Sequence, residues 1–155
     1  MLRRSTNASS NFAVGLKLVS TTAPVMTFFI FVRKVGLKPG EMAIGLKIPY
    51  VEGQKAVFTK FDRRKEVDLS TVCATIGKFN DEYRVAIGSC APTPIRLPKT
   101  EALLKGKKLT PELIGEAAEL AGTEVSPISD VRASAEYRVS LVKVAIRRSL
   151  AELSV

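Results

Sequence analysis

The sequence contains no histidine and no tryptophan, and only two cysteines among its 155 residues. Without histidine, the chain lacks the commonest general base and the commonest metal ligand of proteins. Cys73 and Cys90 stand in apolar runs and form no CxxC pair, so we interpret both as buried thiols that pack like small hydrophobic side chains. We therefore expect no catalytic residue and no metal site in this chain.

Long apolar runs are also absent. The longest, residues 25–32, is far shorter than the roughly 20 residues that span a bilayer. The start of the chain, Met1-Leu2-Arg3-Arg4, is followed by polar residues instead of the apolar stretch of a signal peptide. We predict a soluble, cytoplasmic protein with no membrane partner.

Phosphate-binding loops and acid–base pairs are missing as well. The glycines between residues 36 and 53 stand singly and match neither GxGxxG nor GxxxxGK, the patterns that place backbone N–H groups around a phosphate. Asp62 and Asp68, or Glu116 and Glu119, are the nearest approach to a paired-carboxylate site. The two glutamates fall on the polar face of a predicted helix, so we interpret them as solvated.

Basic residues outnumber acidic ones, 24 against 15, which gives a net charge of +9. Such a surplus attracts acidic proteins, nucleic acid or anionic membranes. The basic residues are scattered, and no run of five or six like charges marks a nucleic-acid-binding arm. We favour a solvated or partner-facing basic surface, with nucleic-acid binding as the alternative.

The first 98 residues predict strands and turns. Residues 1–12 are polar, which predicts a loop or a frayed end. The Pro39-Gly40 and Asn80-Asp81 pairs predict turns. Alternating or β-rich apolar segments predict strands over residues 12–20, 42–48, 56–61, 69–79 and 84–90.

The last third predicts helices. Thr110-Pro111 is a typical helix start, and Gly122 stands where a C-cap glycine would end that helix. Asp130 is the predicted cap of a final helix that runs to about Leu153. The predicted buried side of the final helix consists of Tyr137, Leu141, Val144 and Ala145. Strands followed by helices indicate an α+β fold, an antiparallel sheet of three to four strands packed on about three helices.

Residues 126–138, with the sequence SPISDVRASAEYR, resemble the C-terminal signature of the FAD-binding subunits of molybdenum hydroxylases, the family of xanthine dehydrogenase and carbon monoxide dehydrogenase. Other segments match the same family in the same order. They are residues 37–41 with 47–49, residues 60–68, residues 86–96 and residues 100–106. The ordered set covers most of residues 36–148.

The resemblance implies a division of the chain and a cofactor. Residues 1–55 would be a remnant of the end of an FAD-binding domain, and residues 56–155 a C-terminal domain like that of carbon monoxide dehydrogenase flavoprotein. Lys60 matches a family lysine that approaches the flavin ring, and Ala43 and Ile44 match a strand that lies against the cofactor. The family's glycine-rich pyrophosphate loops are missing, so we expect FAD in the parent complex but not on this chain alone.

The resemblance also implies a function and partners. The chain would be a structural domain that supports the flavin site and subunit docking in a molybdopterin-dependent dehydrogenase, without catalysis of its own. Its partners would be a molybdopterin-binding subunit, a 2Fe-2S subunit and an FAD-domain polypeptide. Two alternatives are a stand-alone interaction module, favoured by the apolar Phe28, Phe29 and Phe31, and a basic nucleic-acid-binding protein.

Overall fold

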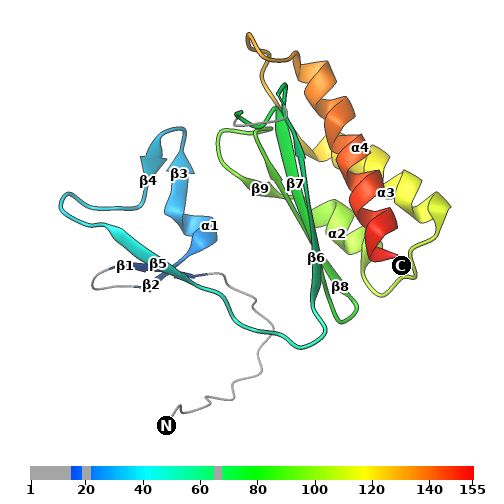
Figure 1. The fold of residues 1–155 in the computed structure, drawn as a ribbon, viewed down its shortest axis with the longest axis horizontal. Helices are drawn as coiled ribbons and strands as arrows, with labels where there is room; N and C mark the ends of the chain where they lie inside the picture. Colours follow the sequence, from blue (N-terminus) through cyan, green and yellow to red (C-terminus); the bar gives the residue numbers. More distant parts are fainter. Residues whose placement is uncertain (1–14, 19–21, 65–67) are drawn as a thin grey trace. The chain divides into compact units, whose positions relative to one another are not determined.

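The structure is a computed structural model that describes residues 15–18, 22–64 and 68–155 (Figure 1). The chain divides into two compact units, Met1–Tyr50 and Val51–Val155. The loop predicted over residues 1–12 lies outside the described residues, and so does most of the strand predicted over 12–20, of which Gly15–Leu18 is found.

Short β elements make up the first unit. β1 (Gly15–Leu18) lies between β2 (Thr22–Pro24) and β5 (Ala43–Lys47) in an antiparallel three-stranded sheet. The intervening chain forms the one-turn helix α1 (Val25–Phe28) and a hairpin of β3 (Phe29–Phe31) and β4 (Lys34–Val35). The strand predicted over residues 42–48 is therefore confirmed as β5.

The predicted Pro39-Gly40 turn is confirmed before β5. The Glu41 N–H donates to the Lys38 carbonyl at 3.0 Å, and the Glu41 carboxylate accepts from the Lys38 N–H at 2.7 Å. Gly40 has φ 83°, in the left-handed region. Proline at the second position and glycine at the third are typical of a type II turn, whose third residue needs a positive φ.

The second unit contains an antiparallel sheet in the order β6-β7-β8-β9. Its strands are β6 (Lys55–Phe61), β7 (Val72–Phe79), β8 (Glu82–Gly88) and β9 (Ile95–Arg96). The β7–β8 hairpin turns at Asn80, whose φ of 55° is a left-handed conformation that asparagine tolerates better than most residues. The three strands and the hairpin predicted here are confirmed.

Three helices lie on one side of this sheet (Figure 1). They are α2 (Pro98–Leu104), α3 (Pro111–Glu124) and α4 (Ala135–Leu153). The expected α+β fold, an antiparallel sheet packed on three helices, is confirmed.

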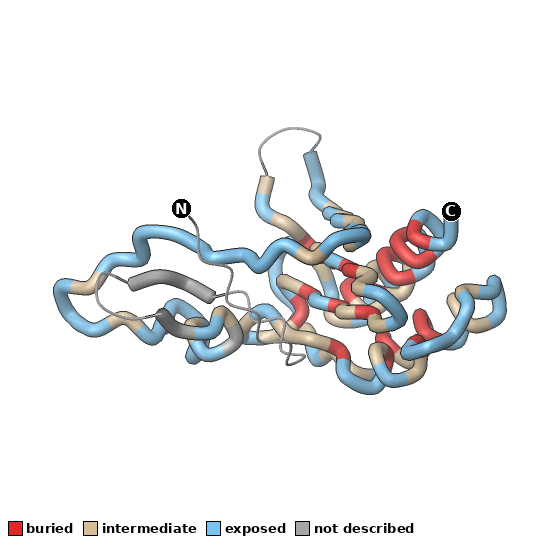
Figure 2. Tube along the Cα trace, turned by 90° about the horizontal axis from the view of Figure 1, so that it is seen from below, coloured by how far each residue is buried: buried red, intermediate tan, exposed pale blue. Residues whose placement is uncertain are grey.

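The core lies between the sheet and the helices. Val72, Ala74 and Ile76 alternate along β7 and are fully buried, as strand periodicity requires of one face. Val142 and Ile146 of α4 are also fully buried. Figure 2 shows buried segments only in the second unit among the residues whose burial is described.

The other face of the sheet has no helix over it within the second unit. Ala56, Phe58 and Lys60 of β6 point to this face and are exposed, Phe58 by 64%. Thr75 of β7 and Ala86 of β8 continue the same row and are exposed too. We call this surface the open face.

The predicted start of α3 is confirmed, and its predicted end is wrong. The Thr110 hydroxyl accepts from the Leu113 N–H at 3.3 Å, with Pro111 in the first turn. Gly122 does not end the helix, which continues to Glu124. A Cβ at Gly122 would lie 2.6 Å from the Lys143 side chain, so this glycine allows α4 to pack closely against α3.

The predicted start and buried side of α4 need correction. Ser134, not Asp130, caps the helix, because its hydroxyl accepts from the Tyr137 N–H at 3.2 Å. Tyr137 is 56% exposed, and Arg138 is buried beside it. Arg138 can occupy the first buried position of α4 because its guanidinium group forms hydrogen bonds with other parts of the protein. The other members of the predicted buried side are buried or partly buried.

Candidate functional site

Lys60 lies at the end of β6, on the open face, in register with Cys73 of β7. Its ammonium group contacts the Asp62 carboxylate at 3.1 Å and donates to the Asp68 carbonyl at 2.9 Å. One third of the Lys60 side chain is exposed. The structure therefore holds a cation at one end of the open face, where it remains accessible from solvent.

Asp68 organises the loop that follows Lys60. Its carboxylate accepts from the N–H groups of Leu69, at 2.8 Å, and Arg63, at 3.2 Å. Burial raises the pKa of Asp68, but these hydrogen bonds and the charge of Arg64 outweigh it and hold the pKa below its ordinary value. Asp62 and Asp68 thus act in ion pairing and loop structure, and not as an acid–base pair.

Ala43 and Ile44 are consecutive residues of β5 in the first unit. Consecutive residues of a strand point to opposite faces, so both cannot lie against the same surface. Ile44 belongs to a row of residues that are each more than half exposed, which we call the β5 apolar row. Its members are Met42, Ile44, Leu46 and Ile48. Lys60 belongs to the other unit.

The described residues fit one part of FAD and not another. The Lys60 cation in the second unit and the exposed apolar strand β5 in the first unit are each suitable neighbours of a flavin ring, taken separately. Gly40, Gly53 and Gly106 adopt positive φ, but each stands alone in a turn and builds no cradle of N–H groups for a diphosphate. The same described part of the chain contains no group of three or more metal-ligating side chains, and none of its helices is long and apolar enough to cross a membrane.

Arg138 connects α4 to the sheet. Its guanidinium donates to the carbonyls of Thr71, at 2.6 Å, and Ser89, at 3.1 Å, and to the Asp130 carboxylate at 2.9 Å. Only 6% of the Arg138 side chain is exposed. Asp130 and Arg138 therefore pin the last helix through a charge-assisted hydrogen bond.

Asp130 also shapes the loop before α4. Its carboxylate accepts from the N–H groups of Arg132, at 2.8 Å, and Ala133, at 3.1 Å, and pairs with the Arg132 side chain. The Arg132 N–H is the largest influence, and with Arg138 it lowers the pKa of Asp130 to about 2 against the opposing effect of burial. The loop depends on a deprotonated Asp130.

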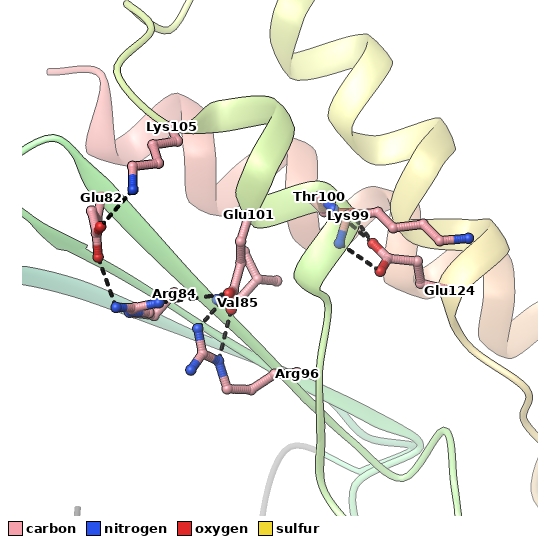
Figure 3. Close-up of polar contacts among 9 residues, drawn as sticks. All are labelled: Glu82, Arg84, Val85, Arg96, Lys99, Thr100, Glu101, Lys105 and Glu124. Carbon is pink, nitrogen blue, oxygen red and sulfur yellow. Dashed lines mark hydrogen bonds and ion pairs between the residues drawn. The ribbon is translucent and has the colours of Figure 1, made fainter. Parts of the chain in front are cut away.

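Glu101 of α2 forms hydrogen bonds with β8 and β9, the last two strands of the sheet (Figure 3). Its carboxylate accepts from the Val85 N–H at 2.8 Å and from Nε of Arg96, also at 2.8 Å. A second Arg96 nitrogen contacts the other oxygen, and Arg84 lies 4.0 Å from it. Only 11% of the Glu101 side chain is exposed, so the carboxylate serves the packing of α2 against β8 and β9.

Glu124, at the end of α3, caps α2 from 24 residues away (Figure 3). Its carboxylate accepts from the N–H groups of Lys99, at 2.9 Å, and Thr100, at 2.8 Å, and from the Thr100 hydroxyl at 2.6 Å. The N-cap position of α2 is Leu97, which has no side-chain acceptor. Local sequence analysis missed Glu124 because capping residues are sought beside the helix that they cap.

The remaining residues considered in the sequence are two glutamates of α3 and the two cysteines. Glu119 pairs with Lys143, at 2.5 Å, and Arg147, at 2.6 Å, which ties α3 to α4, and Glu116 is exposed. Cys90 is buried, and burial raises the pKa of its thiol to about 11. Cys73 is partly buried, so the interpretation as a buried thiol holds in full only for Cys90. The carboxylates of Asp62, Asp68, Glu101, Glu119, Glu124 and Asp130 thus all take part in ion pairs or hydrogen bonds within the second unit.

Comparisons with known proteins agree with this fold. The family model of the CO dehydrogenase flavoprotein C-terminal domain matches residues 56–153. The glyceraldehyde dehydrogenase medium chain of Sulfolobus acidocaldarius is 27% identical over 139 residues, which are 87% of this chain and 50% of that protein. The carbon monoxide dehydrogenase medium chain of Hydrogenophaga pseudoflava is 27% identical over 135 residues, 83% of this chain and 47% of that protein.

Solved structures share the fold. Carbon monoxide dehydrogenase from Hydrogenophaga pseudoflava has a TM-score of 0.81 at 25% identity, over 90% of this chain and 52% of that chain. Quinoline 2-oxidoreductase from Pseudomonas putida 86 has a TM-score of 0.83 at 23% identity, over 92% of this chain and 53% of that chain.

The chain spans about half the length of these relatives. The match to the family model covers all three helices of the second unit and its sheet except Lys55, the first residue of β6. The chain therefore belongs to the CO dehydrogenase flavoprotein C-terminal domain family, which confirms its resemblance to the C-terminal part of the FAD-binding subunits of molybdenum hydroxylases.

Proposed function

We propose that this chain acts as the C-terminal structural domain of the FAD-binding subunit in a molybdopterin-dependent dehydrogenase. In this role it supports the flavin site and the docking of other subunits during electron transfer. The observation that carries the proposal is the family match over residues 56–153, which covers the helices of the second unit and, apart from Lys55, its sheet. The use of carboxylates such as Glu101 and Asp130 in internal hydrogen bonds suits a supporting domain.

Residues 1–55, which include the whole first unit, would belong to the end of the FAD-binding domain. β5 would contribute an apolar flavin contact, which is Ile44 if the β5 apolar row faces the cofactor and Ala43 if the opposite face does. Lys60 is a separate candidate contact. FAD would supply electron transfer. The ammonium group of Lys60 would favour negative charge on the reduced flavin.

The diphosphate of FAD would be held by glycine-rich loops on an FAD-domain polypeptide. The other partners would be a molybdopterin-binding subunit and a 2Fe-2S subunit. The exposed β5 apolar row supports this dependence on other protein, because four large apolar side chains in a row are costly to leave in water. Relatives that are named as medium chains support it as well.

The first experiment is to purify the full chain from its native host at moderate salt and to analyse what accompanies it. We expect flavin absorbance, molybdenum and at least two further polypeptides in a fixed ratio. A colourless chain that elutes alone would overturn the proposal.

The role of Lys60 has its own test in the purified complex. We expect Lys60→Gln to lower the midpoint potential of the flavin, because removing a cation disfavours the anionic reduced form. Lys99→Gln is the matched control, since Lys99 is an exposed lysine with no side-chain partner among the described residues. Equal potentials in the two variants would remove Lys60 from the flavin site.

A stand-alone interaction module is the second candidate. Phe29 and Phe31 of the β3–β4 hairpin are 40% and 60% exposed, and such aromatic side chains favour a protein partner. This candidate predicts companions without flavin or molybdenum, so the same purification separates it from the first.

A further inference from the structure

Five lysines come together at one end of the second unit. Lys55 begins β6 and Lys78 lies near the end of β7, while Lys105, Lys107 and Lys108 belong to the loop between α2 and α3. The Gly106 N–H donates to the Asp81 carbonyl at 3.0 Å, which ties this loop to the β7–β8 turn. We call these five residues the lysine end.

Most of this charge is not neutralised. Lys105 pairs with Glu82 at 3.0 Å. Within the described part of the chain, the other four lysines have no carboxylate within ion-pairing distance. Lys55 and Lys78 are direct cross-strand partners, an arrangement of like charges that destabilises a sheet. Lys55 and Lys78 lie together without a carboxylate at ion-pairing distance among the described residues. Binding of an external anion would therefore reduce their repulsion and stabilise the fold.

A pocket lies between these two lysines. It has a volume of about 240 Å³ and is lined by Lys55, Lys78, Gly53, Asn80 and residues 153–155. The Lys78 ammonium group also lies 5.9 Å from the centre of the Tyr83 ring. The pocket is large enough for a carboxylate side chain, and the two lysines in its lining carry the opposite charge.

The lysine end is separate from Lys60. Lys55 and Lys60 stand at opposite ends of β6, so about 17 Å of strand lies between them at roughly 3.3 Å per residue. The proposed flavin contact therefore leaves the lysine end free for another role.

We propose that the lysine end docks an acidic segment of a partner subunit, with one carboxylate seated between Lys55 and Lys78. The partner's identity as a subunit rests on the proposed function. One observation favours protein over nucleic acid. Tyr83, whose ring centre lies 5.9 Å from the Lys78 ammonium group, is 4% exposed and offers no face for base stacking.

The direct test uses the purified full chain and fluorescein-labelled deca-glutamate as the probe. We expect the quadruple variant Lys55→Gln, Lys78→Gln, Lys107→Gln, Lys108→Gln to bind at least about tenfold more weakly than the unsubstituted chain at low salt. The matched control removes four exposed lysines elsewhere, at positions 34, 38, 47 and 99, and should bind within about twofold. Circular dichroism checks that each variant is folded.

Two results would overturn the proposal. One is an equal loss of deca-glutamate binding in the two quadruple variants, which would reduce the effect to net charge. The other is tighter binding of a short DNA duplex of equal charge, with the lysine-end variant losing that binding selectively, which would assign the surface to nucleic acid.

Assembly in the native host separates this proposal from the proposed function. If the unsubstituted chain carries companions and the lysine-end variant loses them at about 150 mM salt while the control keeps them, the docking proposal is supported. If all three chains keep their companions at that salt, the docking proposal fails and the proposed function stands. If the unsubstituted chain elutes alone, the proposed function fails, and the deca-glutamate result alone decides whether the surface binds acidic segments.

Discussion

The guanidinium of Arg138 donates a 2.9 Å hydrogen bond to the carboxylate of Asp130, eight residues earlier. The same guanidinium reaches the carbonyls of Thr71, before β7, and Ser89, after β8. One buried side chain thus joins a helix, the loop before it and the adjacent ends of two strands. The stability of the second unit should depend on this contact more than on any surface ion pair.

Arg138→Ala should lower the free energy of unfolding by about 3 kcal/mol, because it breaks a buried ion pair and leaves a buried carbonyl without a donor. Urea denaturation at neutral pH measures the change. Arg132→Ala is the control, since Arg132 pairs with the same Asp130 from the exposed surface, and it should cost no more than about 0.5 kcal/mol. Equal losses in the two variants would show that burial of Arg138 does not matter.

The pKa of Asp130, lowered to about 2 from an ordinary value of 3.8, predicts a dependence of stability on pH. A carboxyl group whose pKa is lower in the folded state stabilises the fold above its unfolded pKa, and that contribution disappears as the pH falls through the folded pKa. The stability difference between the unsubstituted chain and Asp130→Asn should be constant above about pH 5 and shrink between about pH 4 and 2. Urea midpoints across this range test it, and a constant difference at every pH would contradict it.

Glu101→Ala should lower the free energy of unfolding by about 2 kcal/mol, since the Val85 N–H and the Arg96 guanidinium lose their acceptor. Hydrogen exchange should accelerate at Val85 in particular, because Glu101 is the acceptor of that amide. Glu116→Ala, an exposed change on α3, serves as the control and should stay within about 0.5 kcal/mol. Unchanged protection of Val85 in Glu101→Ala would contradict the expected role.

Gly88 and Cys73 face each other across β8 and β7 on the open face. A Cβ at Gly88 would lie 2.6 Å from the Cys73 sulfur, so Gly88→Ala should cost about 1 to 2 kcal/mol. In a Cys73→Ala background the same change should be neutral or stabilising, because alanine suits a strand better than glycine once the sulfur is gone. A double-mutant cycle in urea measures the coupling, and additive effects would show that the sulfur moves away freely.

Local patterns predicted much of the fold. Alternation along residues 69–79, the turn at Asn80-Asp81 and the start at Thr110-Pro111 depend on neighbours in sequence, and each is found where the pattern indicated. The order of strands and then helices was sufficient for the α+β class. The ordered motifs of residues 36–148 indicated the family, which the match over residues 56–153 confirms.

Helix ends and the buried side of α4 were predicted less well. Gly122 lies within α3 because it makes room for Lys143, a residue of another helix. Arg138 takes a buried position because Thr71 and Ser89 supply acceptors from the sheet. The hydropathy pattern of α4 predicts that Tyr137 takes this buried position. The pattern fails because it contains no information about hydrogen-bond acceptors from the sheet.

The sequence by itself determined the longer strands and helices, the fold class and the family of this protein, because strand alternation, turn residues and motif order are properties of neighbouring residues. Only the tertiary structure decided that Glu124 caps α2, that Glu101 accepts a hydrogen bond from β8, and that Lys55 and Lys78 are cross-strand neighbours with no carboxylate partner among the described residues. These relationships join residues that are far apart in the chain, and their energies arise from burial and charge that exist only once the chain has folded.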